Sequence, residues 1–198
     1  MKLALSENIL PEQGELYLLK QFYPVEQSQQ WFDRLYHQLN WQQERLFIYG
    51  RWLDVPRLMC WYGDTGADYQ YSGVNHQPLS WTDDLTQIRR DVERVCLTSF
   101  NSVMANLYRN GRDSMGCHAD DEKELGVNPL IASVSLGETR LLRFKQLKSS
   151  QKLDIELDSG DLLVMAGEIQ HHWRHELPKT RRPKKARINL TFRKIISR

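Results

Sequence analysis

The second half of the chain consists of short stretches in which apolar and polar residues alternate, or apolar residues run together, between turn-forming residues. Alternation with a period of two is typical of strands that bury one face. The pattern predicts strands over residues 102–109, 130–136, 140–147, 152–157, 161–166, 169–176 and 186–196. Many short strands with this turn punctuation indicate a jelly roll or a β-sandwich.

The first half contains two stretches with the period of an amphipathic helix. One follows Pro24, and its predicted buried face comprises Trp31, Phe32, Leu35 and Leu39. The other begins after Thr82, a residue type that caps helix N-termini. Its predicted buried face comprises Leu85, Ile88, Val92 and Val95. We expect both helices to pack on a sheet.

Between these helices, aromatic residues alternate with glycines and arginines, and no helical period survives. This pattern predicts short strands and turns. Tyr69 and Tyr71 share one face of an extended segment, and Tyr49 falls at a predicted hairpin tip. Aromatic rings beside Arg51 and Arg57 suit stacking on nucleic-acid bases next to phosphates. Core packing is nevertheless the commoner role of aromatic residues in strands.

Composition limits the function classes. A chain of 198 residues with a net charge of +2 predicts one domain, residues 1–198, with a sizeable core. Three widely spaced cysteines without a C-x-x-C pair favour a reducing compartment over a disulfide framework. Without a predicted signal peptide or membrane span, we expect a cytoplasmic monomer. Nine of the residues 179–198 are Lys or Arg and none is acidic, which indicates either a polyanion-binding edge or a solvated loop.

The strongest candidate for chemistry is the pair His118-x-Asp120. Residues two apart on an extended segment point the same way, so imidazole and carboxylate can reach one metal ion together. A further histidine would complete the two-histidine, one-carboxylate face that holds Fe(II). The candidates are His171, His172 and His175. On a strand, His171 and His175 share a face and His172 takes the other, so alternation does not separate His171 from His175.

The last predicted strand has two contrasting faces. Its polar face comprises Arg187, Asn189, Thr191 and Arg193, and its apolar face comprises Ile188, Leu190 and Phe192. The polar face lies either in solvent, the commoner outcome, or in the interior, where two arginines would require anionic partners such as a dicarboxylate. Asn106 and Tyr108 also share a strand face. Cys117 turns away from the metal-binding face of its segment, so we expect it to pack.

These motifs together resemble the AlkB family of Fe(II)/2-oxoglutarate oxygenases. The resemblance rests on Asn106-x-Tyr108, His118-x-Asp120-Asp121-Glu122, residues 129–137, His175-x-Leu177-Pro178 and the R-I-N-L-T-F-R ending at Arg193. It covers about residues 45–196. The sequence around residues 56–73 is most similar to the branch of the family that repairs alkylated double-stranded DNA.

The resemblance implies roles for individual residues. The implied iron ligands are His118, Asp120 and His175, which are also the implied catalytic centre. The implied 2-oxoglutarate ligands are Asn106, Tyr108, Arg187, Asn189, Thr191 and Arg193. The implied substrate contacts are Tyr69 and Tyr71 in the base pocket, Asp121 or Glu122 at the methylated base, and Tyr49 as a wedge in the duplex.

The resemblance also implies a fold and an activity. The fold would be mainly β with flanking helices (α+β): a double-stranded β-helix (jelly-roll) core over 100–196, an N-terminal strand and helix extension over 1–44, and a nucleotide-recognition hairpin region over 45–80. The activity would be oxidative demethylation of bases such as 1-methyladenine and 3-methylcytosine in DNA. It would use Fe(II), O2 and 2-oxoglutarate, with ascorbate as the reductant in vitro, and release formaldehyde, succinate and CO2.

Three alternatives use the same residues differently. The same oxygenase chemistry could act on RNA or on protein side chains. A binding module with a vestigial iron site could recognise damaged bases without turnover, but the intact triad and both arginines argue against it. A zinc hydrolase could use the same three ligands, but it would leave the R-x-N-x-T-x-R strand unexplained.

Overall fold

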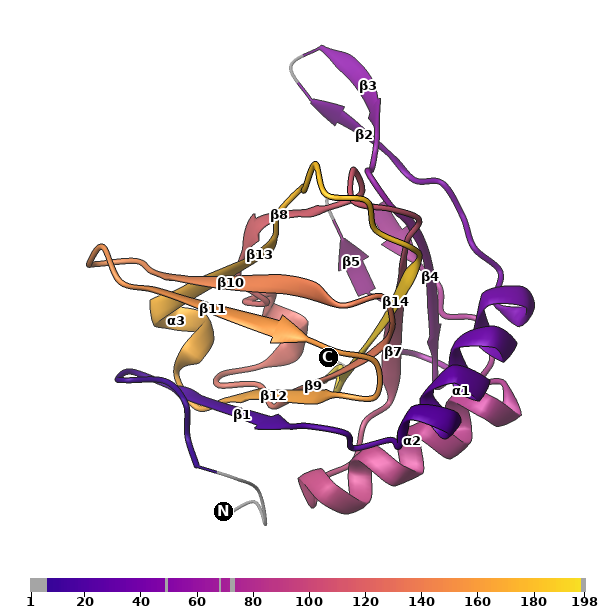
Figure 1. The fold of residues 1–198 in the computed structure, drawn as a ribbon, viewed down its shortest axis with the longest axis horizontal. Helices are drawn as coiled ribbons and strands as arrows, with labels where there is room; N and C mark the ends of the chain where they lie inside the picture. Colours follow the sequence, from indigo (N-terminus) through magenta and orange to yellow (C-terminus); the bar gives the residue numbers. More distant parts are fainter. Residues whose placement is uncertain (1–6, 49, 68, 72–73, 197–198) are drawn as a thin grey trace.

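Two antiparallel sheets face each other in the computed structural model, which describes residues 7–196 except 49, 68 and 72–73 (Figure 1). The larger sheet has the strand order β1-β12-β9-β14-β7-β4. Its strands are β1 (Glu15–Leu19), β12 (Leu162–Ala166), β9 (Ile131–Gly137), β14 (Arg187–Arg193), β7 (Ser102–Tyr108) and β4 (Leu58–Gly63). Strand β14 therefore lies inside the sheet, with β9 and β7 as its neighbours.

The smaller sheet has the order β11-β10-β13-β8. Its strands are β11 (Lys152–Leu157), β10 (Arg140–Gln146), β13 (Trp173–Leu177) and β8 (Met115–His118). Two further hairpins pair β2 (Arg45–Ile48) with β3 (Arg51–Asp54), and β5 (Tyr69–Tyr71) with β6 (Val74–His76). The helical segments are α1 (Val25–Gln38), α2 (Asp83–Cys96), α3 (Ile169–His172) and the short 3-10 turn η1 (Lys123–Leu125).

The space between the two sheets is filled by large apolar side chains. Phe144 and Leu157 from the smaller sheet and Leu163 and Met165 from the larger one are almost completely buried there, together with Trp173. Facing sheets bury alternate residues of each strand in this way. The result is a mainly β jelly roll whose interior is lined by both sheets.

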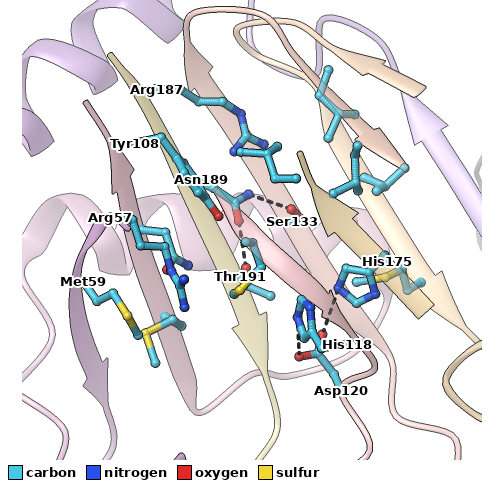
Figure 2. A pocket seen from close by; sticks show the side chains of 18 of the residues that line it. Arg57, Met59, Tyr108, His118, Asp120, Ser133, His175, Arg187, Asn189 and Thr191 are labelled. Carbon is cyan, nitrogen blue, oxygen red and sulfur yellow. Dashed lines mark hydrogen bonds and ion pairs between the residues drawn. The ribbon is translucent and has the colours of Figure 1, made fainter. Parts of the chain in front are cut away.

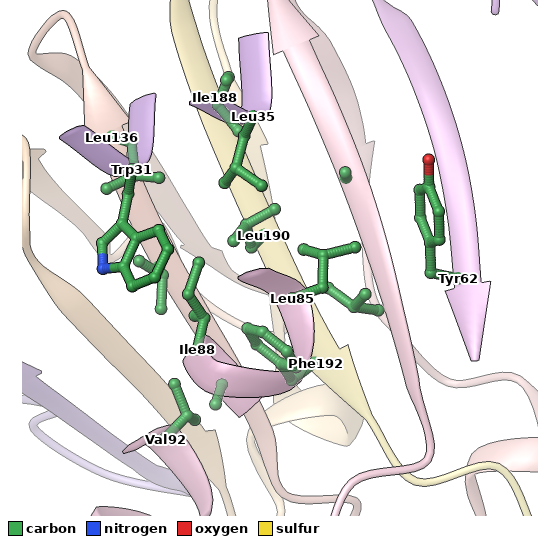
Figure 3. Packing of buried hydrophobic residues seen from close by; sticks show 14 of the residues in the cluster. Trp31, Leu35, Tyr62, Leu85, Ile88, Val92, Leu136, Ile188, Leu190 and Phe192 are labelled. Atoms are coloured by element: carbon green, nitrogen blue, oxygen red, sulfur yellow. The ribbon is translucent and has the colours of Figure 1, made fainter. Parts of the chain in front are cut away.

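Helices α1 and α2 cover the opposite face of the larger sheet (Figure 3). Leu35 of α1 and Ile88 of α2 are fully buried, and they pack in one cluster with Ile188, Leu190 and Phe192 of β14. The apolar positions of β14 therefore face the helices. Because side chains alternate along a strand, its polar positions must face the space between the sheets.

The structure confirms most of the elements predicted from the pattern. Thr82 caps α2 by accepting a hydrogen bond from the Leu85 amide at 3.2 Å. The predicted pairing of residues 140–147 with 152–157 is confirmed by the register Arg140↔Leu157. No helix in the described part of the chain is long and apolar enough to cross a bilayer.

The prediction of one strand over residues 169–176 is wrong for its first half. Residues Ile169–His172 form the helical turn α3, and the strand β13 begins only at Trp173. Neighbours Ile169 and Gln170 are both buried, at 1% and 3% exposure. Alternate residues of β13 point toward the more exposed outer face of the smaller sheet, so a strand continued back through these two positions would turn one of them outward, whereas a helical turn can bury both.

The cluster between the helices and the larger sheet predicts a stability effect. Ile88→Ala should lower the free energy of unfolding by about 2 to 5 kcal/mol, because it leaves a cavity among residues that cannot collapse into it. The exposed Gln87 lies on the same helix, and Gln87→Ala should change stability by less than about 1 kcal/mol. Urea unfolding of both variants measures the difference, and equal effects would contradict this packing.

Candidate active site

The polar face of β14 lies in the interior, which decides between the two alternatives left open by the sequence. Arg187, Asn189, Thr191 and Arg193 are each at most 9% exposed. The neighbouring strands place other polar side chains beside them: β7 pairs Asn106 with Asn189 and Tyr108 with Arg187, and β9 pairs Ser133 with Thr191. These residues line a single cavity between the sheets, with methionine and leucine side chains completing its wall.

The metal-ligand candidates meet at one end of this cavity (Figure 2). His118 ends strand β8 and pairs directly with His175 on the neighbouring strand β13. His118 Nε2 is 3.9 Å from Asp120 Oδ1, and His175 Nε2 is 3.8 Å from Asp120 Oδ2. One ligand atom of each residue lies within 4.8 Å of the other two. The strand pairing therefore makes one site from residues 57 positions apart.

Surrounding groups fix the orientation of the triad. Arg193 donates a hydrogen bond to Asp120 Oδ1 at 2.8 Å, and the Asp120 amide donates to Gln170 Oε1 at 3.0 Å. His118 Nδ1 lies 2.8 Å from the Gly116 carbonyl oxygen, which can only accept. Nδ1 must therefore carry the proton, and Nε2 keeps its lone pair for a metal.

The electrostatics keep His175 and Asp120 in the metal-binding protonation state. Burial, together with the neighbouring His118, lowers the pKa of His175 to about 3. Burial alone would raise the pKa of Asp120, but Arg193, His175 and His118 outweigh it and lower this pKa to about 2. At neutral pH His175 is therefore neutral and Asp120 is a carboxylate, as metal coordination requires.

The triad fits Fe(II). Asp120 Oδ2 is buried and has no hydrogen-bond partner among the residues that the structure describes. Leaving such an acceptor unsatisfied is costly, and a metal ion would satisfy it. Two imidazoles and one carboxylate on a common face are the ligand set of non-haem Fe(II) oxygenases, which leaves coordination positions open. The residues that would hold the ion are His118, Asp120 and His175.

The opposite end of the cavity is suited to an anion. Arg187 is 2% exposed, donates to Ser135 Oγ at 2.9 Å, and lies over the Tyr108 ring at 5.4 Å. Burial lowers the pKa of Arg187 to about 10, which leaves it charged at neutral pH. Within the described part of the chain its Nε has no hydrogen-bond partner. A carboxylate bound here would satisfy that donor and the charge.

Polar side chains connect the two ends. Thr191 Oγ1 donates to Asn189 Oδ1 at 3.1 Å, and Asn189 Nδ2 donates to Ser133 Oγ at 2.7 Å. On the neighbouring strand β7, Asn106 Oδ1 accepts a hydrogen bond from Arg57 Nε at 2.7 Å. All six residues implied for 2-oxoglutarate therefore line one cavity with the metal triad.

Some site residues were not predicted from the sequence. Arg57 was interpreted as a residue near phosphates, beside aromatic rings that stack on bases, but it is 3% exposed and lines the cavity beside Asn106. The serines of A-S-V-S at 132–135 alternate with apolar residues, and this period of two could have predicted Ser133 and Ser135 inside. Nothing in the local pattern indicates that Gln170 reaches the Asp120 amide.

The structure also tests the interpretations of Cys117 and His171. Cys117 was expected to pack, but it is exposed on β8, which is an edge strand of the smaller sheet. His171 does not join the triad: it lies on α3, and its Nε2 is 2.8 Å from Asn128 Oδ1. The helical turn separates it from the face that carries His175.

The implied substrate contacts are less fully described. Tyr49 and the side chains of Tyr69 and Tyr71 lie outside the described residues; the backbone of Tyr69–Tyr71 forms β5. Asp121 is exposed and Glu122 is half-buried in the loop that follows Asp120. Neither acid lines the cavity that holds the triad.

Comparisons with known proteins agree with this geometry. A family profile described as the 2OG-Fe(II) oxygenase superfamily matches residues 15–193. DNA oxidative demethylase ALKBH2 from Homo sapiens is 39% identical over 160 residues, covering 77% of this chain and 61% of that protein. The chain belongs to the AlkB family of these oxygenases. Alpha-ketoglutarate-dependent dioxygenase alkB homolog 3 from Homo sapiens is 33% identical over 184 residues, covering 88% of this chain and 64% of that protein.

The resemblance inferred from the motifs is thus confirmed at the level of the AlkB family. The chain spans 58% of the length of ALKBH2 from Bos taurus, with which it shares 39% identity over 77% of its own residues. The solved structure of OsALKBH1 has a TM-score of 0.65 at 17% identity, covering 95% of this chain and 100% of that one. This likeness confirms the jelly-roll fold. Fe(II) and 2-oxoglutarate are the cofactors of the family, and the cavity residues fit both.

The low pKa of His175 predicts how stability depends on pH in the metal-free protein. In the unfolded chain His175 gains a proton below about pH 6.5, but in the folded protein only near pH 3. Stability should therefore fall by about 2 kcal/mol between pH 7 and pH 5 through this group alone. Urea unfolding with a chelator present measures it. The His175→Gln protein should lose this part of the pH dependence of stability.

The matched control is His37→Gln on the exposed side of α1, which should keep the dependence of the unsubstituted protein. An identical pH slope in the His175→Gln protein and the unsubstituted protein would show that His175 titrates normally and is not buried as described.

Proposed function

We propose that this AlkB-family protein is an Fe(II)- and 2-oxoglutarate-dependent oxygenase that removes alkyl groups from N-alkylated bases of DNA. The observation that carries the proposal is one cavity with a metal-ligand triad at one end and the buried, incompletely bonded Arg187 at the other. The name of the human relative, DNA oxidative demethylase ALKBH2, supports DNA as the substrate. Bases such as 1-methyladenine and 3-methylcytosine are the expected targets.

In this proposal the chain holds both reactants. His118, Asp120 and His175 hold iron, and Arg187 binds the distal carboxylate of 2-oxoglutarate at the far end of the cavity. Arg193 already bonds Asp120, so it lies where the keto-acid end would approach the metal. The remaining contacts to the cosubstrate would come from Asn106, Tyr108, Asn189 and Thr191. Burial of these groups excludes water from the reacting atoms.

Iron with bound 2-oxoglutarate and O2 would supply the oxidising power: one oxygen atom of O2 enters the N-methyl group, and the other enters 2-oxoglutarate as it loses CO2 and becomes succinate. The resulting N-hydroxymethyl group loses its hydroxyl proton to solvent, its C–N bond breaks to release formaldehyde, and the base nitrogen keeps the electron pair of that bond. The protein's contribution is to position the methyl carbon and to exclude solvent.

A second hollow suggests where the base would enter. It lies between the β2–β3 hairpin and β8, and it shares Arg57, Met115 and His118 with the cofactor cavity. Leu46 and Leu53 of the hairpin line its other side. A base must leave the stack to reach such a site, and a methylated base that pairs badly leaves most easily. We propose that the flipped base reaches the iron from this side.

The charge of the lesion would be matched by acids and aromatic rings. Methylation at the pairing edge of adenine or cytosine makes the base cationic, and such a base is stabilised by stacked tyrosines and nearby carboxylates. Tyr69, Tyr71, Asp121 and Glu122 are the proposed contacts. The exposed acid Asp121 directly follows the metal ligand Asp120, which supports its assignment.

The loop between β13 and β14 would hold the phosphate backbone. Lys179, Arg181, Arg182 and Lys185 are exposed in this loop, whereas Lys184 is paired with Glu138 at 2.9 Å. The loop projects on the same side of the molecule as the β2–β3 hairpin (Figure 1). Contacts of this kind are independent of sequence and weaken as salt is added.

The central experiment is aerobic incubation with Fe(II), 2-oxoglutarate and ascorbate, using single-stranded and double-stranded DNA that carries one 1-methyladenine. Mass spectrometry should show loss of the methyl group, with formaldehyde and succinate formed in equal amounts. His175→Ala should abolish the reaction, because it removes one of the three proposed metal ligands. Matched methylated RNA and a methylated peptide are assayed as substrates in parallel.

The outcomes separate the candidate functions. Succinate formation without loss of the DNA methyl group would identify an oxygenase with another substrate, which the RNA and peptide arms would test. If the methyl group is retained and no succinate forms although iron is demonstrably bound, the proposed enzymatic activity is contradicted and a damaged-base binding module is favoured.

Tyr49 provides a separate test of the strand preference. In the sequence it falls between the end of β2 at Ile48 and the start of β3 at Arg51, and we propose that it wedges into duplex DNA when the base flips. Tyr49→Ala should then lower kcat/KM on the duplex about tenfold, since an inserted aromatic ring is worth about 1 to 3 kcal/mol, and leave the single strand unaffected. The matched control is Tyr36→Ala on α1, an exposed tyrosine outside the hairpin. Equal losses on both DNA substrates would refute the wedge.

A further inference from the structure

Two loops join the cosubstrate end of the cavity to the basic surface. The first, residues 109–114, directly follows Tyr108 at the end of β7, and the second, residues 178–186, connects β13 with β14. The Thr180 amide donates to the Gly111 carbonyl at 2.8 Å. A Cβ on Gly111 would lie 2.8 Å from the Thr180 carbonyl oxygen and 3.0 Å from that of Arg182. The two loops are therefore in backbone contact, and only glycine allows this approach.

A buried arginine bonds both loops at once. Arg140, the first residue of β10, is 2% exposed. Its guanidinium donates to the carbonyl oxygens of Asn110 at 3.1 Å and Asp113 at 3.0 Å in the first loop, and of Pro178 at 2.9 Å in the second. A buried guanidinium is costly unless its donors are satisfied. Three carbonyls from two loops provide that compensation only while both loops keep their positions.

The same arginine contacts the cosubstrate site. The Arg140 guanidinium lies 5.9 Å from the centre of the Tyr108 ring, and the Arg187 guanidinium lies 5.4 Å from it. Both distances are within the range of cation–π attraction. Tyr108 and Arg187 line the cavity in which 2-oxoglutarate would bind. A displacement of Arg140 would therefore reach the cosubstrate ligands through Tyr108.

We infer that Arg140 is a positioning residue that fixes the phosphate-binding loop and the 2-oxoglutarate-binding end of the cavity relative to each other. The inference rests on the proposed function for the roles of the loop and the cavity. Arg140 touches neither reactant in this arrangement; it acts through Pro178 on the loop and through Tyr108 on the cosubstrate. Affinity for DNA and affinity for 2-oxoglutarate should therefore depend on one side chain.

The test compares Arg140→Met with Arg140→Lys. Arg140→Met keeps an apolar stem but removes every hydrogen-bond donor. It should raise the KM for 2-oxoglutarate and the KM for methylated DNA about tenfold each, because hydrogen bonds of a charged donor are lost at both loops. The kcat should change by less than about twofold, since the metal triad makes no contact with Arg140. Arg140→Lys keeps the charge and three donors, so it should recover part of both KM values.

Arg89→Met is the matched control. Arg89 lies over the Trp81 ring at 4.4 Å and pairs with Asp64 at 3.1 Å, but it contacts neither loop. Its replacement should leave both KM values unchanged. Hydrogen exchange gives a direct structural readout: the Thr180 amide should exchange faster in Arg140→Met than in the unsubstituted protein and in Arg89→Met, while amides in β14 stay protected.

The results of these experiments decide whether Arg140 is a positioning residue. If Arg140→Met lowers only the melting temperature and leaves both KM values unchanged, Arg140 is merely structural and the inference fails. If only one KM rises, the proposed linkage fails. If the unsubstituted protein does not demethylate DNA, the proposed function fails, but anaerobic titration with 2-oxoglutarate and Thr180 exchange still test Arg140. Unchanged affinity and unchanged exchange would then overturn the inference by themselves.

Discussion

Strand β14 lies inside the larger sheet with apolar side chains on one face and four polar side chains, two of them guanidinium groups, on the other. Burial of a guanidinium costs several kcal/mol unless it is paired and hydrogen-bonded. The rest of the structure satisfies this constraint. The apolar face requires a covering layer, which α1 and α2 provide. The polar face requires partners, which β7, β9 and the Asp120 loop provide.

The two arginines of β14 are satisfied in different ways, and the difference defines the site. Arg193 has a protein carboxylate, Asp120, at 2.8 Å, and this contact fixes a candidate metal ligand. Arg187 has a serine hydroxyl and the face of a tyrosine ring, neither of which carries a charge. A cation in that environment attracts a small anion from solution. The cavity thus has a structural ion pair at the metal end and capacity for an anionic ligand at the other.

Much of this arrangement could be predicted from the sequence because it repeats a simple period. R-I-N-L-T-F-R alternates perfectly, so its two faces are unambiguous, and H-x-D places two ligands on one side of an extended segment. Whether the polar face of β14 lies in solvent or between the sheets could not be predicted, because both arrangements satisfy the same pattern. That choice depends on α1 and α2 packing from a distant part of the chain.

Other features depend on contacts that no local pattern records. The turn α3 interrupts an apparently regular strand, because Ile169 and Gln170 are both required in the interior. Arg57 is buried through its bond to Asn106, a residue 49 positions away in the sequence. Arg140 contacts three carbonyls that are 27 to 38 positions away. For both arginines the partner is set by tertiary structure, and the residue type alone indicates a surface position.

The direct pairing of His118 with His175 has a consequence for how the protein matures. Strand β8, which carries His118, is the outermost strand of the smaller sheet, and within the described residues it pairs with β13 alone. The ion that joins the two histidines would therefore fasten an edge strand to its neighbour. Metal binding and the docking of β8 are then one equilibrium, because a ligand that binds only the docked strand stabilises it by mass action. Iron supply would govern the lifetime of the folded chain in the cell as well as its chemistry, since a chain that never receives iron keeps a detachable edge exposed to chaperones and proteases.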